Sequence, residues 1–336
     1  MLLEKDVAII GAGPVGIFTV FQSGMLGLST VVIEALGAIG GQCTALYPEK
    51  YIYDIPGYPS ILASDLIDSL YQQSKPFNPT ILLNSTMVGL RRRDDAFVIR
   101  TSKGEEIAAK AIILATGAGA LHPKPLSLDN AALYEGKSLF YAVSKKEVFR
   151  DKTIAIFGGG DSAVDWTNSL ADIAKKIYVI HRRDKFRALP DSVEKMYQLV
   201  KQGKVEMAIP YQLDQIYGQD GYISSVDLID FDRNVKNLKI DAILAFFGLS
   251  MDMTFITSLG LDVSNKYINV NPISMETNLK GVYGVGDAVT YPGKLKLILT
   301  GFAETAVACH AAHAIIRPGA TLRFGYSTTV LKDILK

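Results

Sequence analysis

The pattern of apolar and polar positions repeats along the chain. Residues 6–34 and residues 151–181 each begin with a β-branched apolar run and then pass through a glycine-rich turn. Each continues as an amphipathic stretch with helical spacing and ends in a second β-branched run. Such runs predict strands, and the amphipathic stretch predicts a helix between them. The sequence therefore predicts two copies of a βαβ unit.

The turn of each unit has the spacing G-x-G-x-x-G, with alanine at the last position of the second copy. The first copy has Gly11, Gly13 and Gly16, and the second has Gly158, Gly160 and Ala163. The first glycine permits a tight turn, the second lets a pyrophosphate approach the backbone, and the third allows close packing of helix and strand. The phosphates then lie at a helix N-terminus, which favours an anion. Two copies in matched contexts indicate two dinucleotide sites rather than two ordinary glycine-rich turns.

The end of the second strand distinguishes the two copies. Glu34 and His181 both lie 23 residues after the first glycine of their unit. A carboxylate at this place accepts hydrogen bonds from a ribose 2′-hydroxyl and repels a 2′-phosphate. In the second copy the chain continues through Arg182, Arg183 and Arg187, whose guanidinium groups match a 2′-phosphate. We therefore expect the second site to prefer NADPH over NADH, with a solvated basic turn as the alternative.

Composition narrows the classes of protein. With 35 Lys and Arg against 34 Asp and Glu in 336 residues, the near-balance of charge excludes a broadly basic nucleic-acid-binding protein. The length predicts about two domains.

Two cysteines, Cys43 and Cys309, exclude a disulfide scaffold and a metal site with three or four cysteine ligands. The apolar stretch 295–316 carries several polar residues and makes a poor membrane span, and no targeting segment is visible. We expect a soluble, cytoplasmic protein.

Further motifs follow the glycine turns in a fixed order. They are GGQ at 40–42, ALYPEKYIYDIPGYP at 45–59, ATG at 115–117, GGGDSA at 158–163, HRRDKFR at 181–187 and GVGD at 284–287. Over essentially its whole length the chain resembles the thioredoxin reductase-like flavoproteins, and specifically the ferredoxin–NADP⁺ reductases of that type. Nicotinamide and flavin are the usual pair of cofactors in such a chain, because flavin takes a hydride and releases electrons singly.

The resemblance implies FAD in the first unit. Asp287 would bond a ribityl hydroxyl, Gln42 the flavin or its ribityl chain, and Tyr47 would stack on one flavin face. A helix starting near Gly301 would aim its N-terminus at the flavin pyrimidine. The residues expected to bind FAD, apart from those of the C-terminal extension, are Gly11, Gly13, Pro14, Val15, Gly16, Glu34, Gly41, Gln42, Tyr47, Asp54, Met87, Leu121, Gly286 and Asp287. Of these, Val15, Met87 and Leu121 would make backbone contacts. The expected NADPH residues are Gly158, Gly160, Asp161, Ser162, His181, Arg182, Arg183 and Arg187.

The chain departs from the thioredoxin reductases at the redox dithiol. Their Cys-x-x-Cys, placed before the second glycine turn, is replaced here by Tyr-Ala-Val-Ser at 141–144. Cys43 and Cys309 are 266 residues apart and are expected to be single buried thiols. In place of a dithiol, the chain has a C-terminal extension after the last predicted helix. The resemblance implies that Tyr326 in this extension would cover the flavin face opposite Tyr47 and that Thr328 would also contact FAD. Such a tail reaches a partner subunit's flavin only in a homodimer.

The sequence therefore predicts an α/β fold with two Rossmann-like three-layer domains. An FAD domain of residues 1–117 and 248–336 would hold an inserted NADPH domain of residues 118–247. The expected activity is hydride transfer from NADPH to flavin N5, followed by single-electron transfer to ferredoxin or flavodoxin, with no catalytic side chain. The alternatives are a disulfide or small-molecule reductase with an external thiol partner, and a non-enzymatic FAD redox sensor.

Several basic and histidine residues are expected to have plainer roles. His310 and His313 share a helix face without a third ligand, so core or surface histidines are expected rather than a metal site. The run 91–93 is expected to be a solvated turn before a strand. It could also help to dock an acidic protein, as could the lysines Lys201, Lys204, Lys294 and Lys296.

Overall fold

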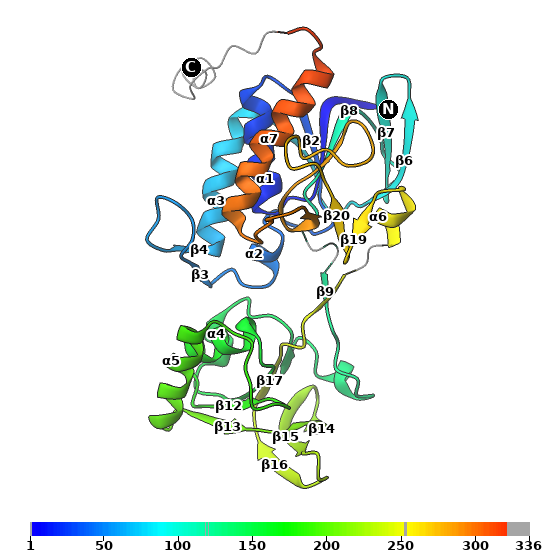
Figure 1. The fold of residues 1–336 in the computed structure, drawn as a ribbon. Helices are drawn as coiled ribbons and strands as arrows, with labels where there is room; N and C mark the ends of the chain where they lie inside the picture. Colours follow the sequence, from blue (N-terminus) through cyan, green and yellow to red (C-terminus); the bar gives the residue numbers. More distant parts are fainter. Residues whose placement is uncertain (1, 118, 120, 252–253, 321–336) are drawn as a thin grey trace. The chain divides into compact units, whose positions relative to one another are not determined.

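The chain divides into two compact units in a computed structural model that describes residues 2–117, 119, 121–251 and 254–320. One unit combines residues 1–121 with 251–336, and the other is formed by residues 122–250 (Figure 1). The second unit is thus inserted into the first. The two connections, β9 (Leu121–Pro123) and β18 (Leu249–Met251), pair with each other as a two-stranded sheet.

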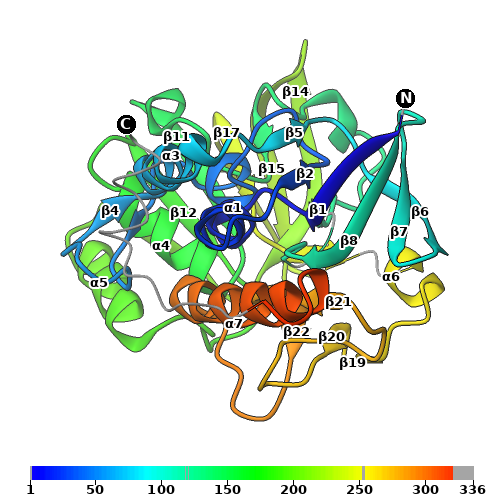
Figure 2. The ribbon, with the colours of Figure 1, turned by 90° about the horizontal axis from the view of Figure 1, so that it is seen from above.

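The first unit is built on a mostly parallel sheet. Its strands β5 (Thr80–Leu82), β2 (Thr30–Ile33), β1 (Leu3–Ile10) and β8 (Glu106–Leu114) lie side by side and parallel, and β21 (Val282–Gly284) pairs with the C-terminal half of β8. The N-terminal half of β8 pairs with the antiparallel hairpin of β7 (Ala96–Thr101) and β6 (Met87–Arg93). Figure 2 shows this strand order from β2 through β1 and β8 to β7 and β6.

Burial along β8 follows its two kinds of neighbour. Its first residues alternate between exposed and buried beside β7, whereas the last four are all buried where β8 runs between the parallel strands β1 and β21. Parallel strands covered on both faces read as continuous apolar runs. The helices α1 (Pro14–Met25), α3 (Ala63–Ser74) and α7 (Ile298–Ile316) pack side by side over the sheet (Figure 1).

The strand register brings the ends of four strands to one edge of the sheet. Ile10 at the end of β1 is paired with Ile33 of β2 and with Leu114 of β8, and Leu114 is paired with Gly284 of β21. The segments that follow these strands therefore meet at a single edge. In open parallel sheets this carboxyl edge is where ligands bind.

Short elements complete the first unit. They are α2 (Gln42–Ala45), β3 (Tyr51–Ile52), β4 (Ile61–Leu62), η1 (Lys75–Phe77), α6 (Thr254–Ser258), β19 (Val263–Ser264), β20 (Tyr267–Asn269), η4 (Gly286–Ala288) and β22 (Val289–Thr290). Two expectations change here. The arginines at 91–93 are the end of strand β6 itself rather than a turn before a strand, and the last helix begins at Ile298, three residues before Gly301.

The second unit repeats the plan on a smaller scale. Its parallel sheet has the order β10 (Leu139–Phe140), β17 (Ala242–Ala245), β11 (Thr153–Phe157), β12 (Lys176–Ile180) and β13 (Val205–Ala208). Around it lie α4 (Asp161–Leu170), α5 (Pro190–Lys201), η2 (Ala131–Leu133), η3 (Lys146–Phe149) and the antiparallel strands β14 (Gln212–Gln219), β15 (Tyr222–Ile229) and β16 (Val235–Lys239). Phe157 of β11 is paired with Ile180 of β12 and Ala245 of β17, so this sheet also has a common carboxyl edge.

The predicted α/β class and both predicted βαβ units are confirmed, as β1–α1–β2 and β11–α4–β12. Among the described residues, no helix is both long enough and apolar enough to cross a membrane.

Candidate cofactor sites

The first glycine turn encloses an open space in front of helix α1. Gly11 has φ +104°, and a Cβ there would lie 2.5 Å from the Ala115 carbonyl oxygen, while a Cβ on Gly16 would lie 2.0 Å from the Gly11 oxygen. These two glycines are required by the fold itself. A Cβ on Gly13, in contrast, would meet no atom within 4 Å. No side chain of the described residues caps α1 at Gly13, so no side-chain acceptor occupies its first N–H groups, and such a helix N-terminus favours an anion.

Glu34 supports this turn from the end of β2. Its side chain is buried, and its Oε2 accepts the Ala12 N–H at 2.6 Å while Oε1 accepts the Leu36 N–H at 2.8 Å. The sequence predicted only a bond to a ribose hydroxyl. A carboxylate has about four acceptor positions, so Glu34 can hold the turn and still accept from a ribose.

The Gly-Gly-Gln segment and the end of β8 close on the same turn. The Gly40 N–H donates to the Ala12 carbonyl oxygen at 2.7 Å, and a Cβ on Gly41 would lie 3.0 Å from Gly13 Cα. Gln42 begins α2, and its Nε2 lies 3.8 Å from the position of a Cβ added to Gly117. Segments that are distant in sequence therefore converge around Gly13.

Tyr47 lies close to two of the predicted carboxylates. Its hydroxyl is 3.9 Å from Cys43 Sγ, and burial raises the pKa of Tyr47 far above its usual range, with Asp287 and Asp54 raising it further. The hydroxyl is therefore neutral. Because both carboxylates act on this one hydroxyl, the structure brings Tyr47, Asp54 and Asp287 into one neighbourhood. Burial also raises the pKa of Asp287, and Lys294 and Lys296 oppose that shift.

A buried ion pair that the sequence did not indicate holds the loop before Asp287. Glu304, on the first turns of α7, accepts the Gly286 N–H at 2.7 Å through Oε2. Its Oε1 accepts the Tyr291 hydroxyl at 2.7 Å and the ammonium of Lys294. The side chains of Glu304 and Lys294 are only 3% and 4% exposed. The expectation that Lys294 could dock an acidic partner is therefore wrong, because its charge points into the unit.

The start of α7 packs directly on the first glycine turn. A Cβ on Gly301 would lie 2.4 Å from Val15 Cγ2 and 3.3 Å from Gly286 Cα. The first turns of α1 and α7 and the loop at Gly286 are thus in mutual contact at the carboxyl edge of the sheet. Both helix N-termini stabilise negative charge there.

Of the remaining predicted FAD residues, the structure describes the positions of some but not of others. Met87 is buried in the core and is the first residue of β6. Two residues earlier, the Ser85 N–H donates to the Glu34 carbonyl oxygen at 2.9 Å. Leu121 begins the connecting strand β9. Tyr326 and Thr328 lie outside the described residues.

The second glycine turn repeats the first with one informative change. Gly158 has φ +146°, and a Cβ there would lie 2.8 Å from the Phe246 oxygen, whereas a Cβ on Gly160 would meet nothing within 4 Å. Between them, a Cβ on Gly159 would lie 2.2 Å from His181 Nε2. The imidazole of His181 therefore packs on this turn where Glu34 bonds the first one. Burial lowers the pKa of His181, and the neighbouring arginines lower it further, which favours the neutral ring.

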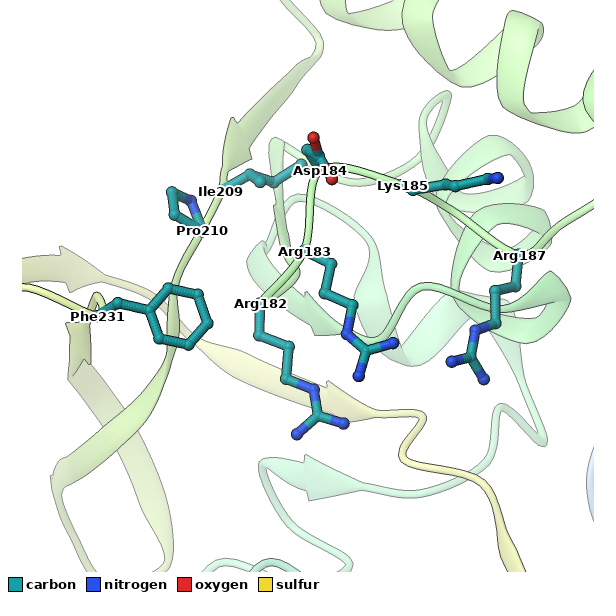
Figure 3. Close-up of a pocket in the computed structure, with 8 residues that line it drawn as sticks. All are labelled: Arg182, Arg183, Asp184, Lys185, Arg187, Ile209, Pro210 and Phe231. Carbon is teal, nitrogen blue, oxygen red and sulfur yellow. The ribbon is translucent and has the colours of Figure 1, made fainter.

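The loop after His181 folds back on the glycine turn. The Arg187 N–H donates to the Gly159 oxygen at 2.6 Å, and the Leu189 N–H donates to Asp161 Oδ1 at 3.0 Å. Asp161 and Ser162 open α4 beside this loop and are exposed. The loop lines an open pocket of about 850 Å³. Figure 3 shows that the side chains of Arg182, Arg183 and Arg187 point the same way, away from Asp184 and Lys185.

The structure contains no dithiol within the part of the chain that it describes. Cys43 and Cys309 are both buried and free, as predicted, and they lie in separate clusters of the first unit. At the place of the missing Cys-x-x-Cys, the Tyr141 hydroxyl donates to Glu135 at 2.8 Å. His310 is exposed and His313 is buried, and no group of three or more metal-ligating side chains occurs among the described residues.

Neither thiol is expected to react in the folded protein. Burial raises the pKa of Cys43 to about 11 and that of Cys309 to about 12, and only the thiolate is nucleophilic. At pH 8 we expect a thiol-specific chromogenic reagent to label the native protein about 100-fold more slowly than the urea-unfolded protein, which should release two equivalents. A rapid first equivalent from the native protein would contradict the assignment of both thiols as structural.

Comparisons with known proteins agree with this arrangement. A family model described as pyridine nucleotide-disulphide oxidoreductase matches residues 5–312. The ferredoxin–NADP reductase of Rickettsia akari is 49% identical over 326 residues, covering 97% of this chain and 98% of that protein. The ferredoxin–NADP reductase of Ehrlichia chaffeensis is also 49% identical, over 329 residues that cover 96% of each chain. The solved thioredoxin reductase of Lactococcus lactis is similar in structure, with a TM-score of 0.79 and 26% identity over 93% of this chain and 99% of that chain.

The resemblance drawn from the motifs is thereby confirmed. The chain belongs to the pyridine nucleotide-disulphide oxidoreductase family, together with relatives that carry the name ferredoxin–NADP reductase.

Proposed function

We propose that the protein transfers electrons between NADPH and ferredoxin through FAD. The observation that carries this proposal is the contrast between the two glycine turns. One is held by the buried carboxylate of Glu34, and the other opens onto a pocket lined by Arg182, Arg183 and Arg187. A carboxylate favours a free ribose hydroxyl, and guanidinium groups favour a 2′-phosphate. We therefore assign FAD to the unit of residues 1–121 and 251–336, and NADPH to residues 122–250.

The residues of the first unit fit FAD by shape and by charge. The space in front of Gly13 admits a pyrophosphate, and the half-buried Tyr47 offers an aromatic ring near Asp287. When bound, FAD accepts a hydride and can release electrons singly, which couples a two-electron donor to a one-electron acceptor. The protein supplies position and electrostatics, with two helix N-termini directed at developing negative charge.

Ferredoxin is proposed as the acceptor because the 47–49% identical relatives carry that name and because the described residues contain no dithiol. Flavodoxin, which also takes single electrons, is proposed as an alternative acceptor. A homodimer is proposed because the tail around Tyr326 resembles one that covers a partner subunit's flavin. Two free cysteines fit a reducing compartment, so we propose the cytoplasm.

Replacing Arg182 and Arg183 together with Ala is expected to raise KM for NADPH about 10- to 100-fold. Hydrogen bonds to a charged group contribute about 1.5–3 kcal/mol each, and solvent at this open pocket lowers that figure. KM for NADH should change less than about threefold, because NADH has no 2′-phosphate. The control is Lys201→Ala, which removes an exposed charge from α5 in the same unit. Equal losses with both nucleotides would contradict the phosphate assignment.

The acceptor is tested with the purified, FAD-loaded protein. NADPH oxidation is followed with ferredoxin, flavodoxin, thioredoxin or oxygen alone as acceptor. The proposal expects reduction of ferredoxin well above the oxygen background and none of thioredoxin. Reduction of thioredoxin alone would favour a disulfide reductase, and failure with all acceptors would favour a redox sensor.

A further inference from the structure

The arginine-lined pocket also has an apolar side. Phe231, Ile209 and Pro210 line it together with the arginines. In Figure 3 the Phe231 ring extends from its turn toward Arg182, with Ile209 and Pro210 on the same side of the pocket. Phe231 as a whole residue is 74% exposed, an unusual setting for phenylalanine. The pocket is therefore amphipathic, with guanidinium groups next to an exposed aromatic ring.

The turn that carries Phe231 is fixed by its own hydrogen bonds. Asp230 Oδ1 accepts the N–H groups of Asp232 at 2.9 Å and Asn234 at 2.8 Å, and Asp230 Oδ2 accepts the Asn234 side-chain amide at 2.9 Å. These bonds lock the connection between β15 and β16. The ring is thus presented on a preorganised turn, which lowers the entropy cost of binding a ligand.

The other apolar residues are tied to the chain that leads into the arginines. The His181 N–H donates to the Ala208 oxygen, and the Tyr211 N–H donates to the His181 oxygen, both at 3.2 Å. Ile209 and Pro210 lie between these two bonds and so run beside the start of the loop 181–187. Phe186 does not compete for the role of Phe231, because its ring packs between His181 and Tyr197.

We infer that Phe231 is the stacking surface for the adenine base of NADPH, with Ile209 and Pro210 forming the rest of an adenine subsite. The inference rests on the proposed binding of NADPH to the second glycine turn. Adenine and the 2′-phosphate belong to one nucleoside, so a phosphate held by the arginines places the base against a neighbouring wall. Among the residues that line the pocket, Phe231 provides the aromatic ring. Stacking of a base on an aromatic side chain contributes about 1–3 kcal/mol.

This role differs from that of the arginines in one measurable way. NADPH and NADH share the adenine base, whereas only NADPH carries the 2′-phosphate. Loss of the Phe231 ring should therefore weaken both nucleotides by the same factor, and loss of the arginines should weaken NADPH selectively. The two effects can be separated in one set of steady-state measurements.

The test uses the full-length, FAD-loaded protein with ferricyanide as acceptor, so that it does not depend on ferredoxin. We expect Phe231→Ala to raise KM for NADPH and for NADH by a common factor of about 5 to 30, with kcat unchanged. The dissociation constant of adenosine 2′,5′-bisphosphate should rise by a similar factor, while that of reduced nicotinamide mononucleotide stays constant. Phe231→Trp should keep all four values within about twofold.

Two further variants make the result decisive. Phe231→Leu keeps an apolar side chain without a ring and should resemble Phe231→Ala. Tyr222→Ala removes another exposed aromatic from β15, outside the pocket, and should change nothing. Unchanged KM values in Phe231→Ala, or a loss confined to NADPH, would overturn the adenine subsite. If the Arg182 and Arg183 variants also show no selectivity, the proposed NADPH site itself fails, so the two failures are distinguishable.

Discussion

Replacing Glu304 with Ala is expected to destabilise the unit of residues 1–121 and 251–336, to which we assign FAD, by about 3–5 kcal/mol, the usual effect of removing one partner of a buried ion pair. The change leaves the ammonium of Lys294, only 4% exposed, without its counter-charge. It also leaves the Gly286 N–H and the Tyr291 hydroxyl without their acceptor. Because Gly286 directly precedes Asp287, we also expect FAD to be lost during purification. The measurements are urea unfolding followed by far-ultraviolet circular dichroism, which needs no bound flavin, and the flavin-to-protein absorbance ratio.

A pair of further variants separates the effect of the charge from that of the hydrogen bonds. Lys294→Met alone removes the ammonium and leaves Glu304 with its two other donors. The double variant Lys294→Met/Glu304→Gln has no charge at either position of the pair and keeps a carbonyl oxygen as acceptor. We expect it to be more stable than Glu304→Ala by about 2 kcal/mol or more, because uncompensated charge is the larger cost. Equal stability of the two variants would show that the ion pair does not hold this loop.

Local patterns were sufficient to predict the two βαβ units. A β-branched run, a glycine turn and an amphipathic stretch determine a strand, a turn and a helix from neighbouring residues alone. The contrast between Glu34 and His181 was also visible, because both positions follow directly from the length of the unit. These features do not depend on how distant segments pack.

The sequence did not indicate two features of the structure, the ion pair of Lys294 and Glu304 and the pocket shared by Phe231 and the arginines. Both depend on segments that lie together only in the folded protein. Lys294 and Glu304 are ten residues apart across an irregular loop and the start of α7, and no periodicity pairs them. Lys294 therefore looked like one more surface lysine. Phe231 follows a strand of one sheet of the second unit and the arginines follow a strand of another, so only the folded structure shows that they line one pocket.

The role of His181 shows the same limit at a single residue. Its position in the sequence marked the place of the ribose, but the packing of its ring on Gly159 was not predictable. That contact explains why the second copy has glycine where the first has Ala12. The first copy can carry a Cβ there because Glu34 approaches the backbone N–H rather than the Cα.

Substituting Gly160 with Ala is expected to abolish tight nicotinamide nucleotide binding while leaving the protein folded. Gly160 has φ −100° and ψ −178°, which alanine adopts freely, and an added Cβ would meet no protein atom within 4 Å. The structure itself gives no reason for a glycine at this position. A pyrophosphate that approaches the backbone does give one, because the methyl group would occupy its place. We expect KM for NADPH and NADH to rise about 10- to 100-fold, with FAD content and thermal stability unchanged.

Gly158→Ala provides the matched contrast from the same turn. Its φ of +146° is strained for alanine, and the Cβ would lie 2.8 Å from the Phe246 oxygen, so this variant should lose stability whether or not nucleotide is present. Thermal unfolding with and without NADPH distinguishes the two substitutions. Without NADPH, the unfolding temperature of Gly160→Ala should equal that of the parent protein. Adding NADPH should raise it less than in the parent, because a ligand stabilises a folded protein only to the extent that it binds to it. A Gly160→Ala variant with full stabilisation by NADPH would mean that the pyrophosphate does not lie on this turn.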